Sequence, residues 1–324
     1  MKNIIFADDK TIKQPKGALI VEKPQEQDHI LGGEAGEDFD ILMENGQWLD
    51  ERPEPELQRN NKGDTFMCVT YSLNNIHEYI YKKRYDEIIN FSDIFVGVGS
   101  GTIRGRGNSK RTVAEWKRTH GWVKEGDYPY LDDMTLDEVY KPLTSALLKK
   151  GLEGLDLATT RYKWVGDNSA TAIKAGLKHS PVQVDVQQYN IKNGIVYWNS
   201  VSQAYIHEVA IVGYVDGKYW IIEDSENEQY LKYAWNYPFG SPMIHCIKKT
   251  MKIEILKKKG HSALCVKTYD EPSLIAFSGG DITAETLFKS VYGIRGWNEV
   301  PIKEVDEWPF PIKHIFNSNP YRGN

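Results

Sequence analysis

The chain has 324 residues, of which 40% are hydrophobic and 26% are charged, an ordinary composition for a globular protein with enough apolar material for a large core. Its net charge of -5 gives no reason to expect a nucleic acid or an anionic membrane as a partner. The apolar run near the N-terminus is too short for a signal peptide, and no stretch approaches the length of a membrane span.

Three cysteines, Cys68, Cys246 and Cys265, are too few and too scattered for a disulfide framework or a zinc site. We therefore expect a reducing compartment. The odd number leaves at least one free thiol to be explained. Nothing in the sequence implies a metal or an organic cofactor.

The first part of the chain reads as loop. Residues 1–47 are rich in charged residues and glycine and show little periodicity, which predicts an extended N-terminal arm. Residues 48–63 carry two prolines and a polar run, so we expect a loop there as well. It ends at Asp64 and Thr65, either of which is a residue type that caps a helix.

A helix is predicted directly after this loop. Apolar residues recur from Val69 to Ile80 at spacings of four, three and four, which predicts one buried face on a helix that ends near Lys83. Cys68 then lies in the first turn. The unpaired N–H groups and the positive end of the helix dipole at that position favour a thiolate over a thiol.

The next stretch, residues 91–107, is rich in glycine. No Lys-Ser/Thr pair follows at the spacing of a phosphate-binding loop, so the glycines are weak evidence for a nucleotide. A cleft wall that a peptide backbone approaches closely explains them as well. On this interpretation Gly105 and Gly107 contact a substrate.

Helices are predicted mainly before residue 180 and strands after it, an α+β order. The periodicity changes again from Lys248, where short alternating runs predict a small β-rich module. We therefore divide the chain into an arm (1–47), a main domain (48–247) and a C-terminal module (248–324). The expected helices are 109–120, 135–150 and 169–179, and the expected strands are 181–186, 194–198, 263–266 and 274–277.

Two apolar runs follow His207, joined by the turn Asp216-Gly217, and predict a β-hairpin. That hairpin brings Asp224 back beside His207. A histidine oriented by a carboxylate and facing a thiol at a helix start is the arrangement that makes a cysteine nucleophilic at neutral pH. The residues thus favour cysteine peptidase chemistry.

In the order of these blocks the chain resembles the papain-like cysteine peptidases. Gln58 precedes Cys68-Val-Thr-Tyr-Ser, Gly121-Trp-Val-Lys-Glu-Gly-Asp-Tyr-Pro-Tyr130 follows the glycine-rich wall, and the stretch from His207 ends in Tyr-Trp-Ile-Ile-Glu-Asp-Ser225. The resemblance implies a two-lobed fold with a helical left lobe and a β-barrel-like right lobe. It implies Cys68 as nucleophile, His207 as base, Asp224 as its orienting residue and Gln58 as oxyanion donor. It also implies a peptide or protein substrate, contacted by Gly105, Gly107 and Ile206.

The chain departs from the family pattern at several positions. Val69 follows the cysteine where the family usually has tryptophan, and Asp224 stands where it usually has asparagine. Glu226 replaces the tryptophan that normally shields the bond between the histidine and its orienting residue. Gln58 lies further from Cys68 than is usual, so Asn60 or Asn61 is an alternative amide donor.

Three functions stay open at this stage. The first is a peptidase with an altered site. The second is a papain-like fold retained as a structural or binding component of a larger assembly such as a phage particle, built through the N-terminal arm and the C-terminal module or as a homo-oligomer. In the third, the thiol attacks an amide bond that is not part of a protein, such as one in a cell-wall cross-link. In each case we expect a cytoplasmic or virion-associated protein, with a phage genome as one candidate source, and without nucleic-acid or membrane partners.

Overall fold

The computed structural model describes most of the chain and divides it into two compact units, residues 1–248 and 249–324. We describe each unit by itself. The residues described are 4–13, 24, 39–187, 189–199 and 205–250, together with the backbone of the strand segments 252–258, 261–267, 272–277, 302–304 and 312–316.

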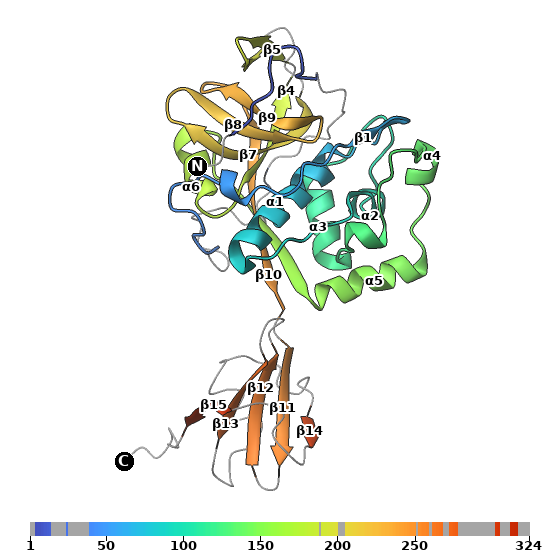
Figure 1. Ribbon diagram of the computed structural model, residues 1–324, viewed down its shortest axis with the longest axis vertical. Coiled ribbons are helices and arrows are strands. Elements are labelled where there is room, and N and C mark those ends of the chain that lie inside the picture. The colour runs from blue at the N-terminus through green and yellow to red at the C-terminus, as the bar shows by residue number, and fades with distance from the viewer. Residues whose placement is uncertain are drawn as a thin grey trace. The chain divides into compact units, whose positions relative to one another are not determined.

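The first half of the larger unit is helical (Figure 1). Helix α1 (Cys68–Tyr85) is the longest helix of the described residues and contacts α2, α3 and two strands of the sheet. The remaining helices are η1 (Leu49–Glu51), α2 (Asp93–Gly99), α3 (Lys110–His120), η2 (Glu125–Asp127), α4 (Leu136–Val139), α5 (Ser145–Leu155) and α6 (Ala170–Leu177).

Helix α1 begins at Cys68, so the predicted position of that residue in the first turn is confirmed. The predicted cap is wrong, because Met67 occupies the cap position and no side chain caps the helix. Thr65 instead donates its hydroxyl to the Gln58 carbonyl oxygen at 2.8 Å. The Asp64 carboxylate accepts the Phe66 N–H at 2.8 Å. Both polar side chains hold the loop before the helix rather than the helix itself.

The helix predicted over 135–150 is two helices in the structure. The first, α4, is a single turn with a capping box between Thr135 and Glu138. The second, α5, starts after Thr144, whose hydroxyl accepts the Leu147 N–H. Pro142 lies between them, where it removes a backbone donor and disfavours helical geometry in the residue before it.

Two glycines of the glycine-rich stretch serve packing rather than a cleft wall. A Cβ atom on Gly97 of helix α2 would lie 2.3 Å from the Met67 sulfur, and one on Gly99 would lie 2.1 Å from the Trp116 ring. Only a residue without a side chain permits these close approaches. The α2 helix is thereby pressed against both α3 and the residue that precedes Cys68.

The second half of the unit is a sheet of eight strands in the order β3-β10-β4-β7-β8-β9-β6-β5. β7 pairs antiparallel with both β4 and β8, and the β7–β8 hairpin turns at 216–217 as predicted. A separate two-stranded hairpin, β1 (Arg59–Asn60) and β2 (Gly63–Asp64), precedes α1. The strands of the large sheet are β3 (Ala158–Trp164), β4 (Val182–Gln187), β5 (Tyr189–Lys192), β6 (Ile195–Trp198), β7 (Tyr205–Val215), β8 (Tyr219–Asp224), β9 (Asn227–Ala234) and β10 (Gly240–Lys249).

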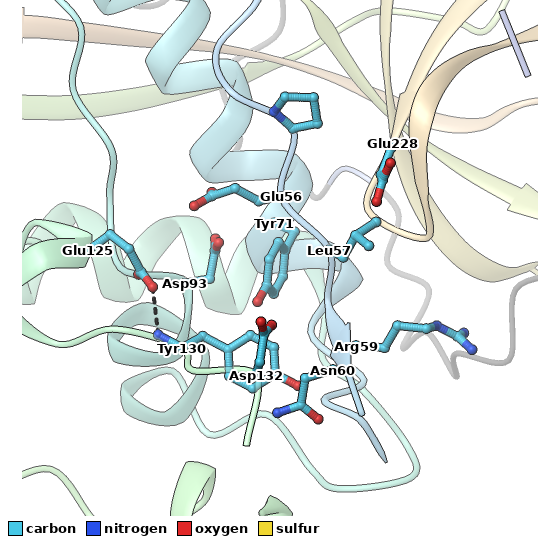
Figure 2. A pocket seen from close by; sticks show the side chains of 11 residues that line it. Glu56, Leu57, Arg59, Asn60, Tyr71, Asp93, Glu125, Tyr130, Asp132 and Glu228 are labelled. Atoms are coloured by element: carbon cyan, nitrogen blue, oxygen red, sulfur yellow. Dashed lines mark hydrogen bonds between the residues drawn. The ribbon is translucent and has the colours of Figure 1, made fainter. Parts of the chain in front are cut away.

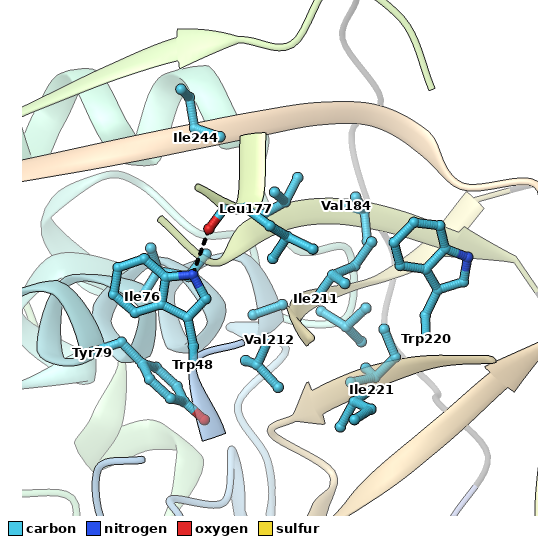
Figure 3. Packing of buried hydrophobic residues seen from close by; sticks show 14 of the residues in the cluster. Trp48, Ile76, Tyr79, Leu177, Val184, Ile211, Val212, Trp220, Ile221 and Ile244 are labelled. Carbon is cyan, nitrogen blue, oxygen red and sulfur yellow. Dashed lines mark hydrogen bonds between the residues drawn. The ribbon is translucent and has the colours of Figure 1, made fainter. Parts of the chain in front are cut away.

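The main core lies between α1 and the central strands, where Figure 3 shows Ile76 and Tyr79 facing residues of β7. Trp48 is fully buried there, and its indole N–H donates to the Leu177 carbonyl oxygen at 2.7 Å. The Trp48 backbone N–H donates to the Val212 carbonyl oxygen at 2.9 Å. This packing fixes α1 against β7, and therefore fixes Cys68 relative to His207.

Residues 4–13 of the predicted arm pack on the sheet. Phe6 forms a parallel bridge with Tyr230 of β9, and the Ala7 N–H donates to the Tyr230 carbonyl oxygen at 3.0 Å. Ala7 and Ile12 are buried in the main core cluster. This part of the arm is thus an added edge of the larger unit.

The second unit contains a five-stranded sheet in the order β14-β11-β12-β13-β15. β11, β12 and β13 pair antiparallel in sequence, whereas β14 and β15 each pair parallel at an edge. The chain is therefore α+β, as the sequence predicts. The strands of this unit are β11 (Lys252–Lys258), β12 (His261–Lys267), β13 (Pro272–Phe277), β14 (Ile302–Glu304) and β15 (Ile312–Phe316).

Candidate active site

Cys68 is brought to the site by the start of α1 and is fully buried. Two residues before it, Phe66 has a φ of 56°, in the left-handed region that a bulky side chain rarely adopts. The Asp64 carboxylate accepts the Phe66 N–H and holds this conformation. Local strain of this kind persists where the surroundings enforce it, and here it sets how the chain enters the helix that carries the thiol.

His207 of β7 and Asp224 of β8 lie side by side, as expected from the predicted hairpin. The His207 Nε2 atom lies 2.8 Å from Asp224 Oδ1, and both side chains are completely buried. Burial lowers the pKa of His207, but the nearby charges of Asp224 and Cys68 outweigh it and raise that pKa well above the ordinary histidine value. His207 Nδ1 makes no hydrogen bond of ordinary geometry within the described part of the chain, so it is the ring nitrogen left for the thiol.

The Asp224 carboxylate is held from three sides. Besides His207, it accepts the Glu226 backbone N–H at 2.9 Å on Oδ1. Its other oxygen, Oδ2, accepts the side-chain amide of Asn227 at 3.1 Å. Fixed donors of this kind hold the carboxylate in one orientation, and the carboxylate in turn holds the imidazole ring.

Gln58 lies beside the same turn, and its amide is fully engaged. Its oxygen accepts the Ser225 hydroxyl at 2.7 Å. Its nitrogen donates to Asp64 Oδ1 at 2.9 Å and to Glu226 Oε1 at 3.0 Å. Both N–H groups of the predicted oxyanion donor therefore face carboxylates in this structure.

Glu226 takes the place that tryptophan has in the family pattern and is tied to the loop before α1. It forms an ion pair with Arg59, which also lies 3.2 Å from Asp64. Burial raises the pKa of Glu226 to about 7, although Arg59 and the charge of His207 oppose the shift. The ion pair of Glu226 and Arg59 thus stands beside the His207–Asp224 pair, where the family pattern has an aromatic ring.

The other predicted site residues differ in their contacts and exposure. Asn60 donates its amide to the carbonyl oxygens of Leu131 and Met134, and Asn61 is exposed, so neither replaces Gln58 here. Gly105 is exposed and Gly107 is buried. Ile206, which directly precedes His207, is half-buried.

A family comparison extends over the same elements. Residues 101–237 match the model of the papain family cysteine protease. The match includes His207 and Asp224 and begins after Cys68. This part of the chain is thus similar to the papain family. Comparison with curated proteins finds no match.

Solved structures similar to part of this chain include plant proteases. One is bromelain from Ananas comosus in complex with the E64 inhibitor, 18% identical with a TM-score of 0.45 over 61% of this chain and 96% of that one. Another is the ragweed pollen allergen Amb a 11 in its proform, 16% identical with a TM-score of 0.46 over 61% and 65% of the chains. The recombinant stem bromelain precursor is 19% identical with a TM-score of 0.46 over 63% and 69%.

A buried ion cluster joins a helix of the larger unit to its sheet next to this site. Lys110, the first residue of α3, lies 2.8 Å from Asp185 of β4 and 3.5 Å from Glu208 of β7. Burial lowers the pKa of Lys110, but the two carboxylates outweigh it and raise that pKa. Burial raises the pKa of Glu208 well above its usual range, and Asp185 and Cys68 add to the shift. Lys110 is thus an ion-pair partner of both acids.

Five carboxylic side chains, together with Arg59 and two tyrosines, line a pocket of about 400 Å³ in the larger unit (Figure 2). Burial raises the pKa of Glu125 to about 7 and that of Asp93 well above its usual range. Glu125 accepts the Tyr130 N–H at 2.6 Å. The described residues contain no group of three His, Cys, Asp or Glu side chains suited to a metal ion. The acidic residues of the pocket are Glu56, Asp93, Glu125, Asp132 and Glu228.

Sequence reasoning missed two residues of the site. Asn227 is one, although its position three residues after Asp224 in a tight turn was a usable signal. Glu226 is the other, because the sequence pattern marks it only as a replacement for tryptophan and carries no signal for its pairing with Arg59.

Among the described helices none is both long and apolar enough to cross a membrane.

Proposed function

We propose that this chain is a cysteine peptidase in which Cys68 is the nucleophile, His207 the acid and base, and Asp224 the residue that orients His207. The observation that supports this most directly is the buried His207–Asp224 pair at 2.8 Å, with Cys68 close enough to raise the pKa of His207. A raised histidine pKa favours the ion pair of thiolate and imidazolium that such a nucleophile requires.

The reaction proceeds in two steps. The thiolate of Cys68 attacks the carbonyl carbon of a peptide bond, and the developing oxyanion is stabilised by the Cys68 backbone N–H at the start of α1. The carbon–nitrogen bond breaks as His207 gives its proton to the leaving amine, which leaves a thioester on Cys68. His207 then takes a proton from water, whose oxygen attacks the thioester and releases the acid.

Gln58 joins this mechanism as the side-chain oxyanion donor only after one of its bonds changes. One N–H must leave Asp64 or Glu226 to face a substrate oxygen. Glu226, whose pKa is about 7, is the partner that weakens as an acceptor when it takes up a proton. The backbone carbonyl oxygen of Gln58 accepts the Thr65 hydroxyl, so the backbone stays in place and only the side-chain amide moves.

A second candidate is the papain-like fold used as a structural or binding component. The observation that favours it is the complete burial of Cys68 and His207, because a peptidase site must admit a peptide. An enzyme with this structure has to open before it acts. A purely structural component keeps the pair buried permanently. The peptide or protein substrate, and the assembly through the arm and the C-terminal module, are parts of these two proposals.

The deciding experiment measures the rate of Cys68 alkylation by iodoacetamide against pH, with mass spectrometry to identify the modified cysteine. Cys246 is the internal control, because it is also buried and burial raises its pKa. The peptidase proposal predicts that Cys68 reacts at least tenfold faster than Cys246 at about pH 5 to 6, and that His207→Ala removes the difference.

Cleavage of a denatured protein mixture, read by mass spectrometry with Cys68→Ala as the blank, then tests the reaction itself. New termini that appear with the wild type and not with Cys68→Ala support the peptidase. If Cys68 reacts as slowly as Cys246 at every pH and no new termini appear, the structural function is correct.

A further inference from the structure

A continuous chain of hydrogen bonds leads from the N-terminal segment to His207. The Lys13 backbone N–H donates to the side-chain oxygen of Asn227 at 3.0 Å. The Asn227 side-chain nitrogen donates to Asp224 Oδ2 at 3.1 Å. Asp224 Oδ1 then lies 2.8 Å from His207 Nε2. Lys13 is thereby linked in a single line to three residues that lie about 200 positions later in the sequence.

The Lys13 N–H decides which end of the Asn227 amide faces Asp224. An amide has one accepting oxygen and one donating nitrogen, and a half-turn exchanges them. If the oxygen faced Asp224, two acceptors would oppose each other and the carboxylate would lose a donor. Because a backbone N–H can only donate, the Lys13 group fixes the Asn227 oxygen on its own side and the nitrogen on the carboxylate side.

The segment that carries Lys13 is anchored at both ends. Near its start, the Ala7 N–H donates to the Tyr230 carbonyl oxygen of β9 at 3.0 Å. In its middle, the Asp9 carboxylate accepts the backbone N–H of Asn193 at 3.1 Å and that of Gly194. At its end, the Tyr189 hydroxyl donates to the carbonyl oxygen of Lys13 itself at 2.8 Å. The position of the Lys13 N–H is thus set by contacts on both sides of it.

We propose that residues 4–13 contribute to the active site. Lys13 fixes the orientation of Asn227, and Asn227 is a positioning residue that holds Asp224 and, through Asp224, His207. The inference rests on the proposed function, since it concerns how well His207 serves Cys68. It assigns the N-terminal segment a role in the reaction of this same chain and not only in contacts with other molecules. Displacement of the segment, by a partner or by cleavage, then lowers activity without touching the nucleophile.

The test compares two substitutions at one position. Lys13→Pro removes the N–H donor, whereas Lys13→Ala keeps it and removes only the exposed side chain. Both are made in the full chain, and kcat/KM is measured on the best peptide from the cleavage experiment. The expected value for Lys13→Pro is roughly tenfold below that of Lys13→Ala, because small displacements of catalytic groups cost rate steeply.

A double-mutant cycle assigns that effect to Asn227. Lys13→Pro should lower the rate in the wild-type background and have little further effect in an Asn227→Ala background, since the two changes break the same line of bonds. Asn227→Asp keeps the shape and the acceptor for Lys13 but loses the donor to Asp224, and it should fall to the level of Asn227→Ala. Equal rates for Lys13→Pro and Lys13→Ala, or fully additive effects in the cycle, would overturn the proposal.

A second measurement separates positioning from general damage to the fold. The pH at which activity declines on the alkaline side reports loss of the His207 proton, and the charged groups facing His207 are Asp224, Cys68 and Glu226. Lys13→Pro should move this limb to lower pH relative to Lys13→Ala, which a loosened fold alone does not do. If the wild type itself cleaves no peptide, the proposed function fails, and the alkylation rate of Cys68 in the same variants still decides the inference.

Discussion

The charge of Asp224 is the main reason that His207 keeps its proton in a buried site. Burial alone lowers the pKa of His207, and the neighbouring carboxylate reverses the shift. Asp224→Asn removes the charge and keeps the hydrogen-bond acceptor. We expect the alkaline limb of kcat/KM to move to lower pH by about one unit or more, with a smaller loss of the maximal rate.

The control for that substitution is Asp216→Asn, which removes a carboxylate from the turn of the same hairpin. Asp216 is exposed and pairs with Lys174 at 3.1 Å, away from the site. Its pH profile should match the wild type. If the alkaline limb of kcat/KM lies at the same pH in Asp224→Asn as in the wild type, then a group other than Asp224 keeps His207 protonated.

At the residue scale, the sequence predicts the pair that depends on a local hairpin and misses the groups that depend on distant chain segments. His207 and Asp224 lie on two paired strands joined by one turn, so a local hairpin places them close enough for the 2.8 Å contact. Asn227 is oriented by Lys13, a residue 214 positions earlier in the chain. Two hydrogen bonds of the Gln58 side-chain amide likewise depend on Ser225 and Glu226, which lie 167 and 168 residues later in the chain. No pattern in one sequence signals such contacts.

Helix α3 is tied to strands β4 and β7 by Lys110, and this link should dominate the stability of that junction. The three side chains of the Lys110 cluster are at most 2% exposed. Lys110→Met leaves Asp185 and Glu208 buried without a cation, which should reduce the free energy of unfolding by about 3 kcal/mol. Urea unfolding of the full chain measures the change.

The comparison for Lys110→Met is Arg104→Ala, which breaks a pair of similar length on the surface. Arg104 lies 2.7 Å from Asp137, but the two side chains are 53% and 87% exposed. Solvent and salt screen such a pair, so the expected loss is below about 1 kcal/mol. If both substitutions lower the free energy of unfolding by the same amount, then Asp185 and Glu208 share a proton and Lys110 contributes little to stability.

At the element scale, periodicity predicts the elements but not what ends them. The apolar stripe from Val69 predicts α1, and the alternation around Val184 predicts β4. The start of α1 is set instead by the strained residue Phe66 and by the fit of Met67 against Gly97, which are tertiary effects. Pro142 was visible in the sequence and should have divided the helix predicted over 135–150.

The larger unit holds several buried acids whose pKa values are raised, and the stability of the molecule should reflect them. Burial raises the pKa of Glu125 to about 7, so the folded chain keeps this proton to a higher pH than the unfolded chain does. The stabilisation from this group is complete below the ordinary glutamate pKa and is lost as the pH rises towards 7. The raised pKa of Glu226 makes a contribution to the pH dependence of stability with the same sign.

Lys117 acts in the opposite direction. Burial lowers its pKa from 10.5 to about 7, so the stabilisation linked to its neutral form is lost as the pH falls through 7. The pH profile of the wild type is therefore the sum of opposed contributions. A single-site variant is needed to isolate the contribution of Glu125.

Glu125→Gln removes the titration and keeps an oxygen that can accept the Tyr130 N–H. We expect the fall in melting temperature between pH 5 and pH 8 to be smaller in this variant than in the wild type, as followed by near-ultraviolet circular dichroism. Glu153→Gln, at an exposed position of α5, is the matched control. An identical fall in the wild type and Glu125→Gln would show that Glu125 does not control this pH range.

The docking of the N-terminal segment on β9 has a consequence for the order in which the molecule is made. Lys13 leaves the ribosome early, whereas its partner Asn227 follows 214 residues later. At ordinary rates of synthesis the interval is about 10 to 40 s. During that time the segment has no β9 edge to join and Asp224 has not been made. The thiol of Cys68 is therefore synthesised well before the residues that would activate it, and the nascent chain carries a dormant nucleophile until the sheet is complete.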